Sequence, residues 1–161
     1  MPHEPSSLPI HDTVDIHDLP GHLIRRLQQI AVAVFLEETH SLGVTPIQYA
    51  ALQAVAATPG LDQRTLSGHI GLDTSTVAGV IDRLQTRGLL TRTVSRVDRR
   101  ARVLAVTAAG AEALDAMQPA VLQAQKRIMA PLPKGERQEF IRMLKVLVDA
   151  NNELSRAPAE A

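Results

Sequence analysis

Arginine is concentrated in one short stretch of the chain, 95–107, which reads SRVDRRARVLAVT. Four arginines stand around a single aspartate there: Arg96, Arg99, Arg100 and Arg102 around Asp98. A guanidinium group is planar, stays charged at ordinary pH, and binds phosphate or guanine edges through two parallel hydrogen bonds. The stretch therefore indicates a contact with DNA, presented by whatever element carries these side chains.

The runs on either side of this arginine cluster are typical of a β-hairpin. Segments 89–95 and 101–107 are short and rich in β-forming residues, and SRVDRR connects them. We expect the tip of the hairpin to enter the narrow minor groove of a duplex, where the electrostatic potential is most negative. Because a carboxylate is repelled by phosphate, we expect Asp98 to orient one of the arginines.

A net charge of zero, from 17 basic and 17 acidic residues, conceals an uneven distribution. Segment 62–107 contains eight arginines, four aspartates and no lysine or glutamate, so its formal charge is +4 and that of the remainder is −4. This asymmetry favours a nucleic-acid partner for the middle of the chain. The alternative is a solvated basic face of the kind found on many surfaces.

Composition excludes several classes of protein. The 161 residues include no cysteine, which excludes disulfides, thiolate metal sites and cysteine nucleophiles. The composition is 45% hydrophobic and only 2% aromatic, so the core must consist of aliphatic residues, which suits helices. No apolar run is long enough to span a membrane, and the first residues do not resemble a secretory signal. We expect a soluble, cytoplasmic protein.

Apolar repeats of helical period, with residues that cap helix ends, predict six helices. Their ranges are 18–40, 46–57, 62–70, 74–87, 107–130 and 134–152, and the hairpin separates the fourth from the fifth. The expected N-terminal caps are Asp18, Thr45, Asp62, either Asp73 or Thr74, and Thr107. The predicted fold class is mainly α with a small β-wing: a winged helix-turn-helix plus a helical dimerisation region.

The second helix of a helix-turn-helix enters the major groove, and here that helix is 74–87. Its first turn carries short hydroxyl side chains, which can reach base edges or phosphates. Ser67, on the preceding helix, is expected to touch a phosphate. The complete set of expected DNA contacts is Arg64, Ser67, Thr74, Ser75, Thr76, Arg83, Arg96, Asp98, Arg99 and Arg100.

The terminal helices carry more apolar surface than the winged lobe can cover, so we expect two chains to pair through them. A symmetric pair also suits a palindromic site on double-stranded DNA. The predicted division of the chain is an N-terminal arm (1–17), a dimerisation region (18–45 and 108–152), a DNA-binding lobe (46–107) and a C-terminal tail (153–161).

Over about 18–152 the chain resembles the MarR family of transcriptional regulators. The resemblance lies in LSGHIGLDTSTVAGVIDRLQTRGLLTRTVSRVDRRARVLAVTAAG, at Leu66, Val77, Leu84, Gly88, Leu89, Arg92, Asp98, Arg100, Leu104, Thr107 and Gly110. It implies a homodimer that binds an inverted repeat and usually represses nearby genes. It also implies that Arg100 is the minor-groove probe and Asp98 its orienting partner. The family's cysteine-based oxidant sensing is excluded, since the chain has no cysteine.

Within that family, PGHLIRRLQQIAVAVF (20–35) resembles regulators of aromatic-acid catabolism, such as repressors of nicotinate or hydroxycinnamate degradation. Arginine suits a carboxylate, and histidine or tyrosine suits a ring hydroxyl or nitrogen. The expected effector is therefore a small aromatic acid, bound by His17, His22, Arg25, Arg26 and Tyr49. Alternatively, the two arginines are surface residues or form ion pairs in the dimer.

The segment HDTVDIHD offers a second chemistry, because His11, Asp12, Asp15, His17 and Asp18 are all possible metal ligands. A metal-responsive regulator is therefore a second hypothesis, and a metal-dependent hydrolase a more remote one. Hydrolysis would require further histidines and carboxylates on facing helices, and no catalytic set of this kind is evident. We expect no enzymatic activity, no catalytic residue, no bound metal and no cofactor.

Overall fold

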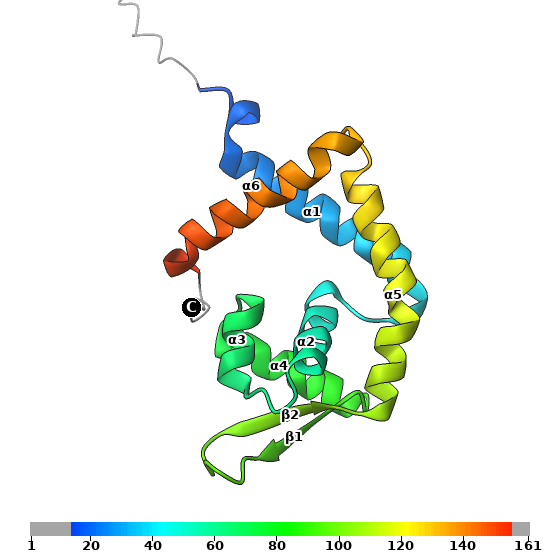
Figure 1. The fold of residues 1–161 in the computed structure, drawn as a ribbon, viewed down its shortest axis with the longest axis vertical. Coiled ribbons are helices and arrows are strands. Elements are labelled where there is room, and N and C mark those ends of the chain that lie inside the picture. Colours follow the sequence, from blue (N-terminus) through cyan, green and yellow to red (C-terminus); the bar gives the residue numbers. More distant parts are fainter. Residues whose placement is uncertain (1–13, 156–161) are drawn as a thin grey trace, which may run out of the picture.

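The structure, a computed structural model, describes residues 14–155 (Figure 1). Its helices are α1 (Pro20–Thr39), α2 (Pro46–Ala57), α3 (Gln63–Ile70), α4 (Thr74–Thr86), α5 (Ala108–Met129) and α6 (Arg137–Ala150). The strands are β1 (Leu90–Val94) and β2 (Arg102–Val106), and short 3-10 turns are η1 (Ile16–Asp18), η2 (His40–Leu42), η3 (Lys134–Glu136) and η4 (Asn152–Leu154). The prediction of a mainly helical fold with a two-stranded wing is confirmed.

The winged lobe is built around one aliphatic core beneath α2, α3, α4 and the wing. Helix α4 buries one side, as its apolar spacing predicted, at Val77, Val80, Ile81 and Leu84. These side chains pack with Leu52, Leu66, Leu90 and Leu104, all of which are almost fully buried. Burial of each side chain of this size contributes about 1.5–3 kcal/mol, so this core fixes the orientation of α4 within the lobe.

Side-chain caps begin most of these helices. Thr45 and Gln48 form a reciprocal capping box at α2, and Asp62, Asp73 and Thr107 accept hydrogen bonds from the first turns of α3, α4 and α5. The prediction for Asp18 is wrong: this residue ends η1, and Leu19 precedes α1 without a side-chain cap. Pro20 at the first helical position needs no hydrogen-bond acceptor for its nitrogen, because proline has no N–H.

The wing is antiparallel, with Leu90 opposite Val106 and Val94 opposite Arg102. It is attached to the lobe by a main-chain hydrogen bond from the N–H of Leu104 to the carbonyl of Leu61, 2.9 Å long. The buried side chains of Leu90 and Leu104 face the core, while the arginine-rich turn lies at the far end. The wing is therefore anchored at its base and free at its tip (Figure 1).

Helix α5 belongs to two parts of the molecule. Near its start, Leu114 joins the core of the winged lobe. One to two turns later, Met117 and Val121 form a second core with Phe35 of α1 and with Val44. A single continuous helix thus connects the lobe to α1, with Pro119 inside it.

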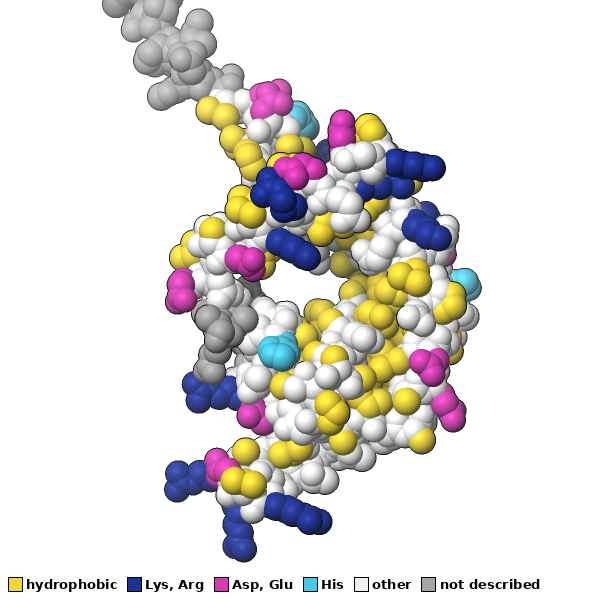
Figure 2. Space-filling view, in the orientation of Figure 1, with side chains coloured by type: hydrophobic (Ala, Val, Ile, Leu, Met, Phe, Trp, Pro, Cys, Tyr) yellow, Lys and Arg dark blue, Asp and Glu magenta, His cyan; other side chains and the backbone are white. Residues whose placement is uncertain are grey.

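Apolar surface remains exposed on α1 and α6 in the single chain. Helix α6 has no buried residue, and hydrophobic side chains lie on the surface over it (Figure 2). The exposed large side chains of the two helices are Leu23, Ile24, Ile30, Leu36, Ile141, Met143, Leu144, Val146, Leu147 and Val148. These faces are the surface that the sequence assigned to pairing between chains.

Candidate nucleic-acid interface

The first turn of α4 is organised by Asp73. One of its carboxylate oxygens accepts hydrogen bonds from the hydroxyl of Ser75 (2.5 Å) and the main-chain N–H of Thr76 (2.9 Å). The other accepts the hydroxyl of Thr76 at 2.8 Å. Led by the Ser75 hydroxyl, these bonds hold the pKa of Asp73 far below its ordinary value. Both hydroxyls are exposed at the start of the recognition helix, where DNA contacts were predicted.

The tip of the wing is a hydrogen-bonded turn. The Ser95 hydroxyl oxygen accepts the N–H groups of Val97 (3.1 Å) and Asp98 (3.2 Å). A carboxylate oxygen of Asp98 accepts the main-chain N–H of Arg100 at 2.9 Å. Asp98 therefore shapes the backbone that carries Arg100 and does not pair with its guanidinium group. The arginine side chains project from this turn into solvent (Figure 2).

An ion pair connects the recognition helix to the wing. Arg92 on β1 donates to the carboxylate of Asp82 on α4 at 2.8 Å, and its other terminal nitrogen lies 3.5 Å from the side-chain oxygen of Gln63 on α3. Three elements of the winged lobe thus meet at one guanidinium group. Arg92 is one of the residues that match the MarR family pattern, whereas no motif in the sequence indicated a role for Asp82. The only sign of this ion pair in the sequence was an aspartate, Asp82, ten residues before Arg92.

Most of the predicted DNA contacts are on the surface, and one is not. The exposed residues are Arg64, Thr74, Ser75, Thr76, Arg83, Arg96, Asp98, Arg99 and Arg100. Ser67 is only 2% exposed, and its hydroxyl donates to the carbonyl of Gln63 at 3.1 Å. The expected phosphate contact of Ser67 is corrected accordingly: it lies beside Leu66 on the inner side of α3 and satisfies its own helix.

A cavity of about 530 Å³ lies between α1, the start of α2, and α4. Its apolar wall includes Val32, Leu36 and Ile47, and its polar wall belongs to the recognition helix, including Ser75, Thr76 and Arg83. The volume suits a small organic molecule. The cavity therefore borders the surface predicted to read DNA.

The predicted effector residues are only partly brought together. The rings of His17 and His22 are 5.8 Å apart, edge to face, and a guanidinium nitrogen of Arg25 lies 3.4 Å from Nδ1 of His22. Arg26 is exposed nearby on α1. Tyr49 packs instead on Phe35, with ring centroids 6.0 Å apart, which places it about 15 Å along α1 from Arg25.

None of these five effector residues is among those that line the 530 Å³ cavity. The His17–His22–Arg25 cluster and the cavity are therefore two separate candidate sites for a small molecule.

For metal binding, residues 14–155 contain no group of three or more His, Asp or Glu side chains able to hold an ion. His11 and Asp12 of the proposed metal segment lie outside the described residues, and Asp15 is engaged by the main-chain N–H of His17 at 2.9 Å. The same part of the chain contains no helix long and apolar enough to cross a membrane.

Comparison with known proteins identifies the lobe. A family model described as MarR family matches residues 42–101. The HTH-type transcriptional repressor NicR of Pseudomonas putida is 31% identical over 148 residues, which are 91% of this chain and 94% of NicR. The chain belongs to the MarR family of transcriptional regulators.

Solved structures of MarR-family regulators agree with this fold. PcaV from Streptomyces coelicolor, in complex with its natural ligand, is 35% identical with a TM-score of 0.78, over 87% of this chain and 99% of PcaV. BpsR from Bordetella bronchiseptica, whose DNA binding is regulated by 6-hydroxynicotinic acid, is 27% identical with a TM-score of 0.81, over 85% and 98% of the two chains. The wing and recognition helix described above are thus those of a transcriptional regulator.

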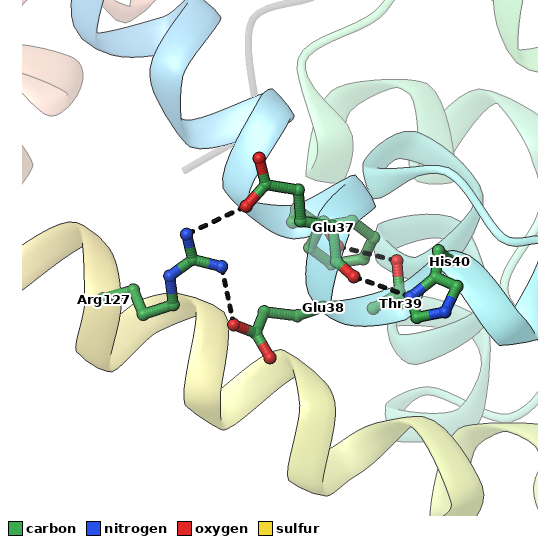
Figure 3. A network of polar contacts seen from close by, with 6 residues as sticks. Glu37, Glu38, Thr39, His40 and Arg127 are labelled. Carbon is green, nitrogen blue, oxygen red and sulfur yellow. Dashed lines mark hydrogen bonds and ion pairs between the residues drawn. The ribbon is translucent and has the colours of Figure 1, made fainter.

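In this MarR-family chain, two arginines hold the end of α1 and the η2 turn that follows it. Arg127 of α5 donates to Glu38 at 2.7 Å and to Glu37 at 2.9 Å (Figure 3), and these bonds raise the pKa of its guanidinium group. Arg87, directly after α4, donates to the carbonyls of Gly43 (2.7 Å) and Leu42 (3.3 Å). The sequence placed Arg87 at the end of the predicted helix 74–87, and no local pattern indicated this contact.

Proposed function

We propose that this protein is a homodimeric repressor that binds an inverted-repeat operator and leaves it when a small aromatic carboxylate binds. The observation that carries the proposal is the pairing of an exposed hydroxyl-bearing first turn on α4 with an arginine-tipped wing on the same core. Residues 46–107 would contact DNA, and residues 18–45 and 108–152 would form the dimer. Such a protein acts on the chromosome in the cytoplasm and catalyses no reaction.

Dimerisation is supported by the exposed apolar faces of α1 and α6. Leu147 and Val148 on α6 are 52% and 65% exposed in the single chain, and Ile24 on α1 is 54% exposed. Burial of apolar area contributes about 25 cal/mol per Å². Pairing of these helices across a twofold axis would therefore be favourable, and it would present two recognition helices to two half-sites.

The choice of an aromatic carboxylate is supported by the cluster at the start of α1. Arginine can only donate, so Nδ1 of His22 must accept from Arg25, and Nε2 then carries the hydrogen. That Nε2 atom is buried and has no hydrogen-bond partner within residues 14–155. A carboxylate could pair with Arg25 or Arg26, while a ring oxygen or nitrogen could accept from His22. The regulation of BpsR by 6-hydroxynicotinic acid gives a relative with a ligand of this type.

Release would follow from the geometry of a dimer on DNA. Two half-sites one helical turn apart are separated by about 34 Å, and the recognition helices must match that distance. A ligand wedged between the terminal helices and the lobe would favour another distance. Ligand and operator would then weaken each other by the same factor, typically about 5–150-fold.

Operator binding and its reversal test the proposal directly. We expect the purified protein to shift a palindromic duplex, selected from a random pool, with an affinity that falls steeply as salt rises. Calorimetry with benzoate, hydroxybenzoate, hydroxycinnamate and hydroxynicotinate should identify a ligand that binds free protein more tightly than operator-bound protein. A chain that selects no duplex contradicts the regulator assignment. A ligand that binds both forms equally contradicts the switch alone.

The residues assigned to the effector can be tested separately. We expect the double variant Arg25→Ala, Arg26→Ala to bind operator normally and to lose release by the aromatic acid. Release that persists in this variant would place the ligand elsewhere, with the cavity beside α4 as the next candidate. Metal-dependent release, abolished by EDTA, would instead support the metal-responsive hypothesis that rests on the segment with His11, Asp15 and His17.

A further inference from the structure

Arg87 makes a contact that links two distant parts of the chain. It is the C-terminal cap residue of α4, and its guanidinium group donates to the carbonyls of Gly43 and Leu42, which are 44 and 45 residues earlier in the sequence. Those carbonyls end a nearly continuous helical run formed by α1 and η2, Pro20 to Leu42. A side chain of the recognition helix thus caps the helix assigned to dimerisation.

The end of a helix is a favourable place for such a cation. The last carbonyls of a helix have no partner within it, and they form the negative end of the helix dipole. Gly43 has a φ of 61°, a left-handed conformation that favours glycine and is typical of the residue that ends a helix. Arg87 supplies two donors where the backbone supplies none, so the contact has a defined geometry.

Direct contact between the recognition helix and α1 is sparse among the described residues. The cavity of about 530 Å³ separates Val32 and Leu36 of α1 from the side of α4 that carries Arg83. A second cavity, of about 440 Å³, is lined by Gly43, by Gln48 of α2, by Arg87 and by residues of α4. Open space cannot resist rotation of one helix against the other. The hydrogen bonds of Arg87 cross this poorly packed boundary.

We propose that Arg87 is a positioning residue that sets the angle between the recognition helix and α1, and hence the distance between the two recognition helices of the dimer. The lobe is also connected to α1 through α5, which packs on the lobe at one end and is tied to α1 by Arg127 at the other, and through Tyr49 of α2, which packs on Phe35. Those contacts are made by α5 and α2, whereas Arg87 ties the C-terminal end of α4 directly to the segment that follows α1. The proposal rests on the proposed function only in requiring a dimer on two half-sites.

The spacing of the operator half-sites tests this role. One base pair more or less displaces a half-site by about 3.4 Å and rotates it by about 35°. We expect the wild-type protein to bind such altered duplexes about fivefold or more weakly than the best one. In Arg87→Met, which keeps the aliphatic stem, we expect the differences between spacings to shrink to about twofold. Arg87→Lys, with a single ammonium group, should lie between the two.

Arg64→Met is the matched control, because Arg64 is an exposed arginine on α3 that is predicted to contact DNA. It should weaken binding to every spacing by the same factor, leaving the profile unchanged. An Arg87→Met profile that parallels the wild type would overturn the proposal. Failure of the wild type to bind any palindrome would overturn the proposed function as well.

A distance measurement without DNA gives a second readout. Since the chain has no cysteine, Gln85→Cys places one spin label on the exposed side of α4 in each protomer. Double electron–electron resonance should give a narrow distance distribution in the labelled wild-type background and a broader one with Arg87→Met. Circular dichroism at the same temperature confirms that the variant is folded. Equal widths would mean that Arg87 does not position the helix.

Discussion

Asp73 determines what the recognition helix can offer to a base. An ionised carboxylate only accepts hydrogen bonds, so the hydroxyls of Ser75 and Thr76 must both donate to it. Because its hydrogen points to Asp73, each of these two hydroxyls offers only its oxygen lone pairs to a group outside the protein. Such groups can accept from the amino groups of adenine or cytosine in the major groove, and they are poorly suited to phosphate oxygens. From the residue types alone, these hydroxyls could contact either base edges or phosphates.

The charge of Asp73 should make stability depend on pH. Its folded-state pKa is depressed by the Ser75 and Thr76 bonds, so it stabilises the fold above its unfolded pKa of about 3.9. That contribution is lost as the pH falls from there toward the folded pKa. We expect Asp73→Asn to be less stable than the wild type at pH 7, with a gap in the free energy of unfolding that narrows below about pH 4. Urea unfolding of both proteins across this pH range measures the difference. A difference in the free energy of unfolding that does not change with pH would contradict the prediction.

At the wing, the two residues of the tip should contribute unequally. Arg100→Ala removes a guanidinium group that buries no apolar surface, so the dimer should stay folded while operator affinity falls by about 1–3 kcal/mol. Asp98→Ala removes the carboxylate that holds the main-chain N–H of Arg100 and should cost less, because the probe remains. Titrations at fixed salt measure both. If Asp98→Ala lost more operator affinity than Arg100→Ala, the geometry of the turn would matter more for binding than the charge of Arg100.

At the scale of elements, local chemistry was predictable and long-range contacts were not. The Asp62 and Thr107 caps, the hairpin and the buried side of α4 follow from spacing within a few residues, and the structure confirms them. Ser67 was misjudged because a hydroxyl on α3 can satisfy its own helix, which its residue type does not reveal. The contact of Arg87 with Gly43 joins segments 44 residues apart, and no local pattern encodes it.

Two glycines should respond oppositely to the same substitution. A Cβ on Gly110 would lie 2.0 Å from the carbonyl oxygen of Leu89, where α5 leaves the wing. We expect Gly110→Ala to lower the free energy of unfolding by about 3 kcal/mol or more, because backbone must move. A Cβ on Gly79 meets nothing within 4 Å, so Gly79→Ala should stabilise α4 by about 0.5–1 kcal/mol.

Thermal and urea unfolding of both glycine variants provide the measurement. Operator titration adds a functional arm, since Gly79 is exposed on the recognition helix and an added methyl group should weaken close approach to DNA. Equal stability of the two variants would mean that the junction of α5 with the wing relaxes freely. Such freedom would also weaken the argument that α5 is a rigid connection.

For the whole molecule, the positive charge lies in the part that binds DNA and the negative charge lies in the part that pairs with the second chain. Segment 62–107 has a formal charge of +4 and the rest −4, so the lobe is drawn to DNA while the paired helices are not. The overall neutrality therefore conceals a polarised molecule. The logarithm of its affinity for DNA should fall linearly with the logarithm of the salt concentration, with a slope set by the number of phosphates that the lobes neutralise. Both lobes of a dimer contribute to that dependence, which makes the oligomeric state decisive for binding.

A charge placed on the apolar face of α6 should separate the two subunits. Leu144 is 37% exposed in the single chain and belongs to the face expected to be buried in the dimer. Leu144→Glu would bury an unpaired carboxylate there, so we expect a folded or partly folded monomer in sedimentation experiments. Because the second half-site is then no longer bound by a tethered lobe, operator affinity should fall by about 100-fold or more. Gln138→Glu, on the polar side of the same helix, should remain dimeric. A dimeric Leu144→Glu protein with full operator affinity would show that the chains pair through another surface, leaving the exposed face of α6 without its proposed role.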